Sequence, residues 1–243
     1  MARSRLGALI GEMWSGTEFI GAMGRLWDEG LPHGDGSGVL LVPGLWGHDA
    51  SLFILRRDLA RLGYDVRTWG LGINNRCGEE TIADLIKAAR RQRNNHRRPL
   101  AVIGHSRGGF MARELARRAP EIADLVITLG TPVGSTTLES ATFGIHLLLR
   151  ISRTLFAKRP GCLTQECGCE YVRNVATTLP ASVAAYSLWS RDDGVVIPES
   201  CVKPGEANVE VPGTHVGMIA NREVLRVIAE TLARYRVPVA PPH

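Results

Sequence analysis

The sequence predicts an α/β fold in which a mostly parallel β-sheet has helices on both of its faces. Two observations carry this prediction. Short apolar runs alternate along the chain with segments of helical periodicity, which is the pattern of a parallel sheet buried on both faces. The chain has 243 residues, 44% hydrophobic and 22% charged. That length and composition suit one large α/β domain and exclude a disordered or collagen-like chain.

The regular alternation begins at residue 38. Gly38–Val42 (GVLLV) is wholly apolar and predicts a buried strand. Leucines at helical spacing predict a helix over 49–62, which Gly63 ends. The next expected elements are a strand over 64–68, a helix over 79–91, a strand over 100–103, a helix over 109–118 and a strand over 124–129. Pro99 precedes the strand over 100–103, and Pro120 closes the helix over 109–118.

The alternation stops at Gly130. Residues 135–182 give no strand signal, and 141–156 is apolar and basic with helical spacing. We therefore expect an inserted helical cap at about 135–182, over one edge of the sheet. Strands resume over 184–189 and 209–211, and a final helix is expected over 221–235. The main α/β domain would then span residues 38–243.

Residues 1–37 are expected to form an N-terminal helical extension, because apolar side chains recur at helical spacing before a loop over 31–37. We expect this helix to pack against the main domain; the alternative is peripheral contact with a membrane surface. No run of 18 apolar residues exists, so no transmembrane helix is expected. The apolar stretch 6–10 is followed by Glu12 and is too short for a secretory signal, which favours a cytoplasmic location.

The formal net charge is +5, with one dense cluster of cations. The cluster consists of Arg90, Arg91, Arg93, Arg97 and Arg98. A nucleic-acid site would need a recognised motif beside such a patch, and none is visible. We interpret the cluster as a solvated helix end and expect neither a nucleic-acid partner nor a protein partner.

The chain has five cysteines, three of them close together as Cys162-x4-Cys167-x-Cys169. This spacing is not a common zinc pattern, so a structural role is favoured and no metal or cofactor is expected. Disulfides among Cys162, Cys167, Cys169 and Cys201 remain an open alternative.

The sharpest chemical signal is Gly104-His105-Ser106-Arg107-Gly108. It follows a predicted strand and precedes a predicted helix. In that context a tight turn exposes the serine hydroxyl above the sheet, and glycines allow the strand and helix to approach. Ser106 is therefore the expected nucleophile.

A serine hydroxyl needs a base, and in this architecture an acid and then a histidine follow the serine in sequence. Of seven histidines, four precede Ser106, His146 lies in the expected cap and His243 in the tail. His215, after a strand and before the last helix, is the remaining candidate. For the acid, Asp192 and Asp193 are adjacent candidates and Glu199 is more distant.

The chemistry also needs two backbone donors for a developing oxyanion. The first is the N–H after the nucleophile, that of Arg107. The second is expected in the loop Pro43-Gly44-Leu45-Trp46-Gly47, which follows an early strand, and we assign it to the Leu45 N–H.

The chain resembles the α/β-hydrolase superfamily, and within it small bacterial triacylglycerol lipases and related esterases. The stretches that carry the resemblance are VLLVPGLWG, AVIGHSRGG, DLVITLGTP, YSLWSRDDGVV and VEVPGTHVGMIANREVL. The resemblance implies the α/β-hydrolase fold, with Ser106 as nucleophile, Asp193 as acid, His215 as base, and the Leu45 and Arg107 amides as oxyanion donors. It also implies hydrolysis of carboxylic esters without a cofactor. The chain departs from the family pattern in its Pro43-Gly44 loop, its cap and its N-terminal extension.

The function expected from the sequence is that of a serine esterase or lipase that works through an acyl-enzyme. Cap residues such as Phe143, Leu147 and Leu148 would favour small-molecule esters with apolar acyl chains. One alternative is an acyltransferase that uses the same triad. Another is a catalytically silent lipid-binding or interaction module.

Overall fold

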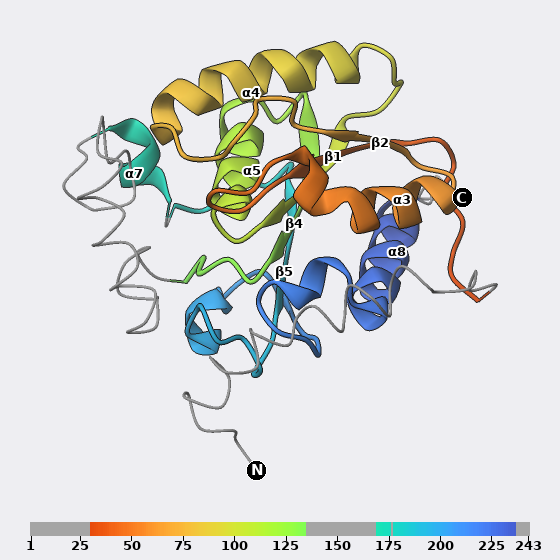
Figure 1. Ribbon diagram of the computed structural model, residues 1–243. Coiled ribbons are helices and arrows are strands. Elements are labelled where there is room, and N and C mark those ends of the chain that lie inside the picture. Colours follow the sequence, from red (N-terminus) through yellow and green to blue (C-terminus); the bar gives the residue numbers. More distant parts are fainter. Residues whose placement is uncertain (1–29, 135–168, 176, 237–243) are drawn as a thin grey trace.

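A computed structural model of the chain describes residues 30–134, 169–175 and 177–236 (Figure 1). The residues described form one six-stranded sheet in the order β2-β1-β3-β4-β5-β6. All five neighbouring pairs are parallel, so the sheet is wholly parallel where the sequence predicted a mostly parallel one. The strands are β1 (Gly38–Val42), β2 (Asp65–Thr68), β3 (Leu100–His105), β4 (Ala123–Leu129), β5 (Ala184–Trp189) and β6 (Ala207–Glu210).

Helices cover both faces of this sheet (Figure 1). They are α3 (Phe53–Arg61), α4 (Gly78–Arg93), α5 (Arg107–Arg118), α7 (Glu170–Asn174) and α8 (Arg222–Arg236). Short 3₁₀ helices occupy Asp49–Leu52, Pro198–Cys201 and Gly217–Ile219. The predicted α/β fold class is thus confirmed.

The alternating residues of the strands divide the core into two layers. Val39 and Leu41 of β1 pack with α3 and α8, whereas Leu40 and Val42 pack with α4 and α5. All four side chains are almost completely buried. Burial of one such side chain contributes about 1.5–3 kcal/mol, which explains why β1 is apolar at every position.

The order of the strands reverses at β1. The chain runs from β1 to β2 at one edge and then returns to β3 on the other side of β1. In an open parallel sheet, such a reversal leaves a crevice at the carboxyl ends of the two strands. The loop that contains Leu45 follows β1, and Ser106 follows β3, so both begin at this place in the fold.

Two boundaries differ from the prediction in ways that matter for the site. β3 continues to His105, and α5 begins at Arg107 instead of Gly109. Ser106 is therefore the only residue between them. At the far edge, β6 starts at Ala207 and is mostly exposed, so its polar residues give little strand signal.

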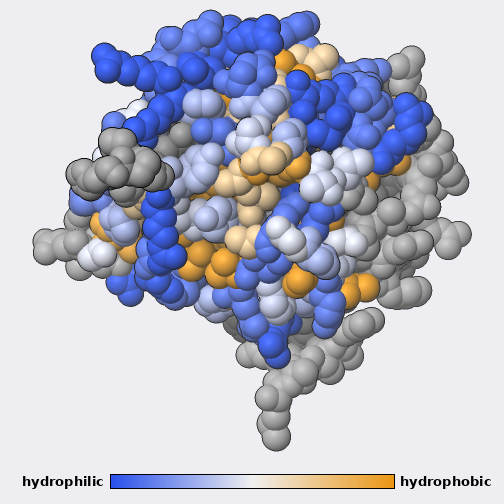
Figure 2. All heavy atoms as spheres, turned by 180° about the vertical axis from the view of Figure 1, so that it is seen from behind, coloured by the Kyte–Doolittle hydropathy of each residue, from blue (hydrophilic) through white to orange (hydrophobic). Residues whose placement is uncertain are grey.

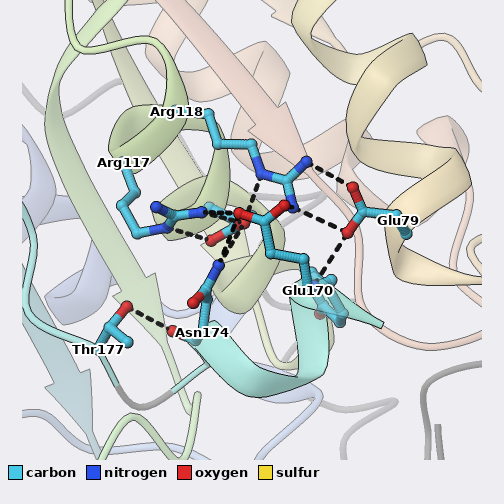
Figure 3. Close-up of polar contacts among 8 residues, drawn as sticks. Glu79, Arg117, Arg118, Glu170, Asn174 and Thr177 are labelled. Carbon is cyan, nitrogen blue, oxygen red and sulfur yellow. Dashed lines mark hydrogen bonds and ion pairs between the residues drawn. The ribbon is translucent and has the colours of Figure 1, made fainter. Parts of the chain in front are cut away.

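Helix α7 is the described helix of the predicted cap, and polar contacts hold it against α4 and α5 (Figure 3). Arg118 donates to both carboxylate oxygens of Glu79 at 2.6 and 2.8 Å, and Glu79 accepts the Tyr171 N–H at 3.0 Å. Arg117 donates to Glu170 at 3.2 Å. The Arg118 side chain holds the pKa of the Glu79 carboxyl below its usual value, so Glu79 is ionised at neutral pH.

The rest of the predicted cap, including 141–156, and the predicted N-terminal helix lie outside the described residues. The domain boundaries at 37 and at 135–182 thus stay predictions. None of the helices described is long and apolar enough to cross a membrane.

In the view from behind, the described face is mostly hydrophilic at its upper part, and hydrophobic residues gather mainly in a band across its middle (Figure 2). Arg90, Arg91, Arg97 and Arg98 are exposed, as expected for a solvated helix end. Cys201 is a buried free thiol, whereas Cys162 and Cys167 lie outside the described residues.

Candidate active site

Ser106 occupies a strained turn at the carboxyl end of β3. Its φ is 52° and its ψ is −124°, a conformation that non-glycine residues rarely adopt. Hydrogen bonds fix the turn: the Ser106 N–H donates to the Leu129 carbonyl at 2.8 Å, and the Thr131 hydroxyl donates to the Ser106 carbonyl at 2.8 Å. Such strain is maintained only where the surrounding structure enforces it, and it is typical of functional sites.

Gly104 and Gly108, two residues before and two residues after Ser106, are required because other main-chain atoms pass very close to them. A Cβ atom at Gly104 would lie 2.4 Å from the Gly108 carbonyl oxygen, and one at Gly108 would lie 2.3 Å from the Val42 carbonyl oxygen. Any side chain would therefore force α5 away from the strands. The G-x-S-x-G pattern is explained here by the packing of helix on sheet.

Asp193 and His215 form a buried pair. His215 Nδ1 lies 2.7 Å from Asp193 Oδ2, and each residue is 4% exposed. The second carboxylate oxygen of Asp193 accepts the N–H groups of Val195 and Val196 at 2.9 and 2.7 Å. With Nδ1–H donated to the carboxylate, His215 Nε2 is the ring nitrogen that can accept a proton.

The structure places the other two candidate acids differently. Asp192 is half-buried, and its N–H donates to the Ser190 hydroxyl at 3.1 Å. Glu199 is exposed on the 3₁₀ helix Pro198–Cys201. Of the three candidates, Asp193 is the one whose carboxylate contacts His215.

Gly130, directly after β4, makes room for this pair. Its φ is 57°, and a Cβ atom there would lie 3.0 Å from both Asp193 Oδ2 and His215 Nδ1. A side chain at this position would thus strain the backbone and press on the hydrogen bond between Asp193 and His215.

His105 is a further site residue that the sequence reasoning missed. Its Nε2 lies 2.9 Å from the His215 carbonyl oxygen, and the two imidazole rings are 4.9 Å apart. Burial, with a smaller contribution from His215, lowers the pKa of His105 to about 3. His105 is therefore neutral at neutral pH, and its Nε2–H donates to the main chain of His215.

His105 also connects Ser106 to the acid–base pair. It precedes Ser106 directly, and its ring contacts the residue that would take the serine proton. The sequence offered one signal for this role, since a residue at the carboxyl end of a strand, next to the turn, lies beside the loops of neighbouring strands.

The two predicted oxyanion donors lie on segments that flank Ser106. A Cβ atom at Gly44 would lie 3.2 Å from Ser106 Cβ, so the loop after β1 runs directly beside Ser106. Within the described part of the chain, no group accepts a hydrogen bond from the Leu45 N–H. Arg107 is the first residue of α5, where a helix leaves its N–H groups without helical partners. Their binding of an oxyanion stays a prediction.

Comparison with known proteins agrees with this architecture. Residues 39–239 match the model of the alpha/beta hydrolase family. A search of curated proteins finds no match.

Several solved structures are similar to this chain over most of its length, at low sequence identity. The chain is similar to an extracellular alpha/beta-hydrolase from a Paenibacillus species, with 14% identity, a TM-score of 0.57, and coverage of 82% of this chain and 98% of that one. It is similar to the Bacillus licheniformis lipase BlEst2 at 16% identity and a TM-score of 0.56, over 86% of this chain and 94% of that one. It is also similar to the Paleococcus ferrophilus monoacylglycerol lipase, with 15% identity and a TM-score of 0.55, over 84% of this chain and 97% of that one.

At these identities the solved structures support the fold alone, while the family model spans most of the sequence. The wholly parallel sheet and the strained serine turn agree with that match. The chain therefore belongs to the alpha/beta hydrolase family.

Proposed function

We propose that this protein hydrolyses carboxylic esters through an acyl-enzyme on Ser106. The observation that carries the proposal is the buried hydrogen bond between Asp193 and His215, at 2.7 Å, in the same site as a strained serine turn. A carboxylate, a histidine and a serine in this arrangement can activate the hydroxyl as a nucleophile.

In the proposed reaction, His215 Nε2 takes the Ser106 proton as the serine oxygen attacks the ester carbonyl carbon. The carbonyl oxygen becomes an oxyanion that accepts hydrogen bonds from the Leu45 and Arg107 N–H groups. As the intermediate collapses, the ester C–O bond breaks and His215 returns the proton to the leaving alcohol. Water, activated by the same histidine, then releases the acid and regenerates Ser106. Asp193 stabilises the imidazolium in both steps.

Apolar residues around the site favour substrates with an apolar acyl chain. Among the described residues, the exposed large hydrophobic side chains are Trp46, Phe53, Ile73 and Val216, each between 38% and 53% exposed. All four lie on segments that follow β1, β2 or β6, at the carboxyl edge of the sheet. The lipases among the similar structures support an ester substrate. We further propose that the cap residues Phe143, Leu147 and Leu148 line the acyl pocket.

The proposal is tested with chromogenic 4-nitrophenyl esters of increasing acyl length, on the wild type and on Ser106→Ala. The matched control is Ser182→Ala, since Ser182 is an exposed serine away from the turn. We expect turnover by the wild type and the control, and a loss of several orders of magnitude in Ser106→Ala with the fold retained.

The same assay separates the alternatives. A burst of nitrophenol without turnover would indicate an acyltransferase that lacks its acceptor. Silence of a folded wild type on every ester would favour a lipid-binding or interaction module and would contradict the proposal.

A further inference from the structure

Asn74, in the loop between β2 and α4, makes three hydrogen bonds to the segment Pro43–Gly47. Its side-chain Nδ2 donates to the Pro43 carbonyl at 2.7 Å, and its main-chain N–H donates to the Gly47 carbonyl at 2.9 Å. Its carbonyl accepts the Trp46 N–H at 3.0 Å. Asn74 is only 1% exposed, so these contacts are shielded from competing water.

The Arg107 side chain in turn fixes Asn74. This guanidinium is buried, and the groups that it contacts are oxygens of amides and of main-chain carbonyls. Nη1 donates to Asn74 Oδ1 and, at 3.3 Å, to the Asn74 carbonyl, while Nη2 donates to the Arg76 carbonyl at 2.6 Å. Because a guanidinium can only donate, it requires Oδ1 to face Arg107, which turns Nδ2 toward Pro43.

The stability of the fold does not explain this arrangement, because the arrangement has a cost in free energy. A buried cation with neutral partners loses hydration, and among the residues that the structure describes no group accepts a hydrogen bond from the buried Arg107 Nε. Buried polar groups that cost stability are typical of functional sites. The arrangement is explained if these side chains place the segment Pro43–Gly47, which would bind the oxyanion.

We propose that Asn74 and the Arg107 side chain are positioning residues that hold Pro43–Gly47 against the nucleophile. This inference rests on the proposed function, in which Leu45 of that segment donates to the oxyanion. Arg107 then acts twice: its main-chain N–H is one donor, and its side chain sets the place of the other through Asn74. A displacement of about 1 Å at such a site costs on the order of a hundredfold in rate.

Asn74→Asp tests the proposal because it keeps the size of the side chain, removes the donor to Pro43 and leaves an acceptor for Arg107. Arg107→Met is the second variant, since it removes the guanidinium and keeps the stem. Asn75→Ala is the matched control, because Asn75 is the exposed neighbour of Asn74. Thermal unfolding shows whether each variant is folded.

For both variants we expect kcat on a short ester to fall by at least about tenfold, with KM within about threefold of the wild type. The affinity for an alkylboronic acid, which forms a tetrahedral adduct on a serine, should fall in parallel with kcat/KM. Asn75→Ala should match the wild type. An unchanged kcat, or a change confined to KM, would overturn the inference.

Hydrogen exchange of the Trp46 N–H provides a readout that does not depend on ester chemistry. We expect faster exchange at this amide in Asn74→Asp and Arg107→Met, and unchanged exchange in Asn75→Ala. If the wild type hydrolyses no ester, the proposed function fails while exchange still tests whether the pair holds the segment. Unchanged exchange in folded variants, or unfolding of both variants, would overturn the inference.

Discussion

His105→Gln is expected to make the protein more resistant to acid. His105 is buried, and its pKa is lowered from 6.5 to about 3, chiefly by desolvation. In the unfolded chain the same histidine would take up a proton near its ordinary pKa. Because the folded pKa is the lower one, the contribution of neutral His105 to stability is fully present above about pH 6.5. It is lost progressively as the pH falls toward 3.

The size of the effect follows from the two pKa values. At pH 5 the unfolded chain is almost fully protonated at His105 and the folded chain is almost fully neutral. Proton linkage then lowers the free energy of unfolding by about 2 kcal/mol relative to pH 8, with a slope that approaches about 1.4 kcal/mol per pH unit. Glutamine cannot be protonated, and its Nε2 can replace the donor that His105 supplies to the His215 carbonyl at 2.9 Å.

The assay is urea unfolding of the wild type and of His105→Gln at several pH values between 8 and 4. The informative quantity is the difference between the two proteins as a function of pH, since carboxylates that titrate in both proteins cancel. We expect this difference to shift in favour of the variant by about 2 kcal/mol between pH 8 and pH 5. An equal pH dependence for both proteins would refute the reasoning, whatever the packing cost of glutamine at pH 8.

Three further predictions concern the site and the cap. Asp193→Asn should lower ester turnover at neutral pH by orders of magnitude, whereas Asp192→Asn should cost little, because His215 Nδ1 lies 2.7 Å from the Asp193 carboxylate; the reverse result would identify Asp192 as the acid. Gly130→Ala should lower both Tm and kcat, since its Cβ atom would lie 3.0 Å from the acid and the base; an unchanged kcat would show that the pair tolerates a neighbour there. Leu147→Asp should impair hydrolysis of long-chain esters more than of acetate esters, and equal losses would indicate an ordinary core position.

Local patterns predicted two of the strands with the bounds that the structure shows. β1 and β5 have the predicted bounds. β1 is apolar throughout because helices cover both of its faces. The sequence predicts a strand over 209–211, whereas β6 begins two residues earlier, at Ala207. An edge strand of this kind is mostly exposed and carries no periodic apolar signal. The strand–turn–helix context of Ser106 was visible in sequence because all of it is local.

Contacts between segments that lie far apart in the sequence could not be predicted from local patterns. The order serine, acid, histidine along the sequence points away from His105, which precedes Ser106. In the structure its ring nonetheless contacts His215, 110 residues later in the sequence. The pairing of Asn74 with Arg107 spans 33 positions and follows no periodicity. Such contacts depend on the order of the strands in the sheet, which no local sequence pattern specifies.

In the proposed reaction, Ser106 carries the acyl group. The most direct measurement is mass spectrometry of the protein after acid quench during turnover of a 4-nitrophenyl ester, with peptide mapping of the adduct. We expect one acyl group on the peptide that contains Ser106, and none in Ser106→Ala or in His215→Ala at the same time point. An adduct on another residue, or undiminished ester turnover by Ser106→Ala without an adduct, would contradict it.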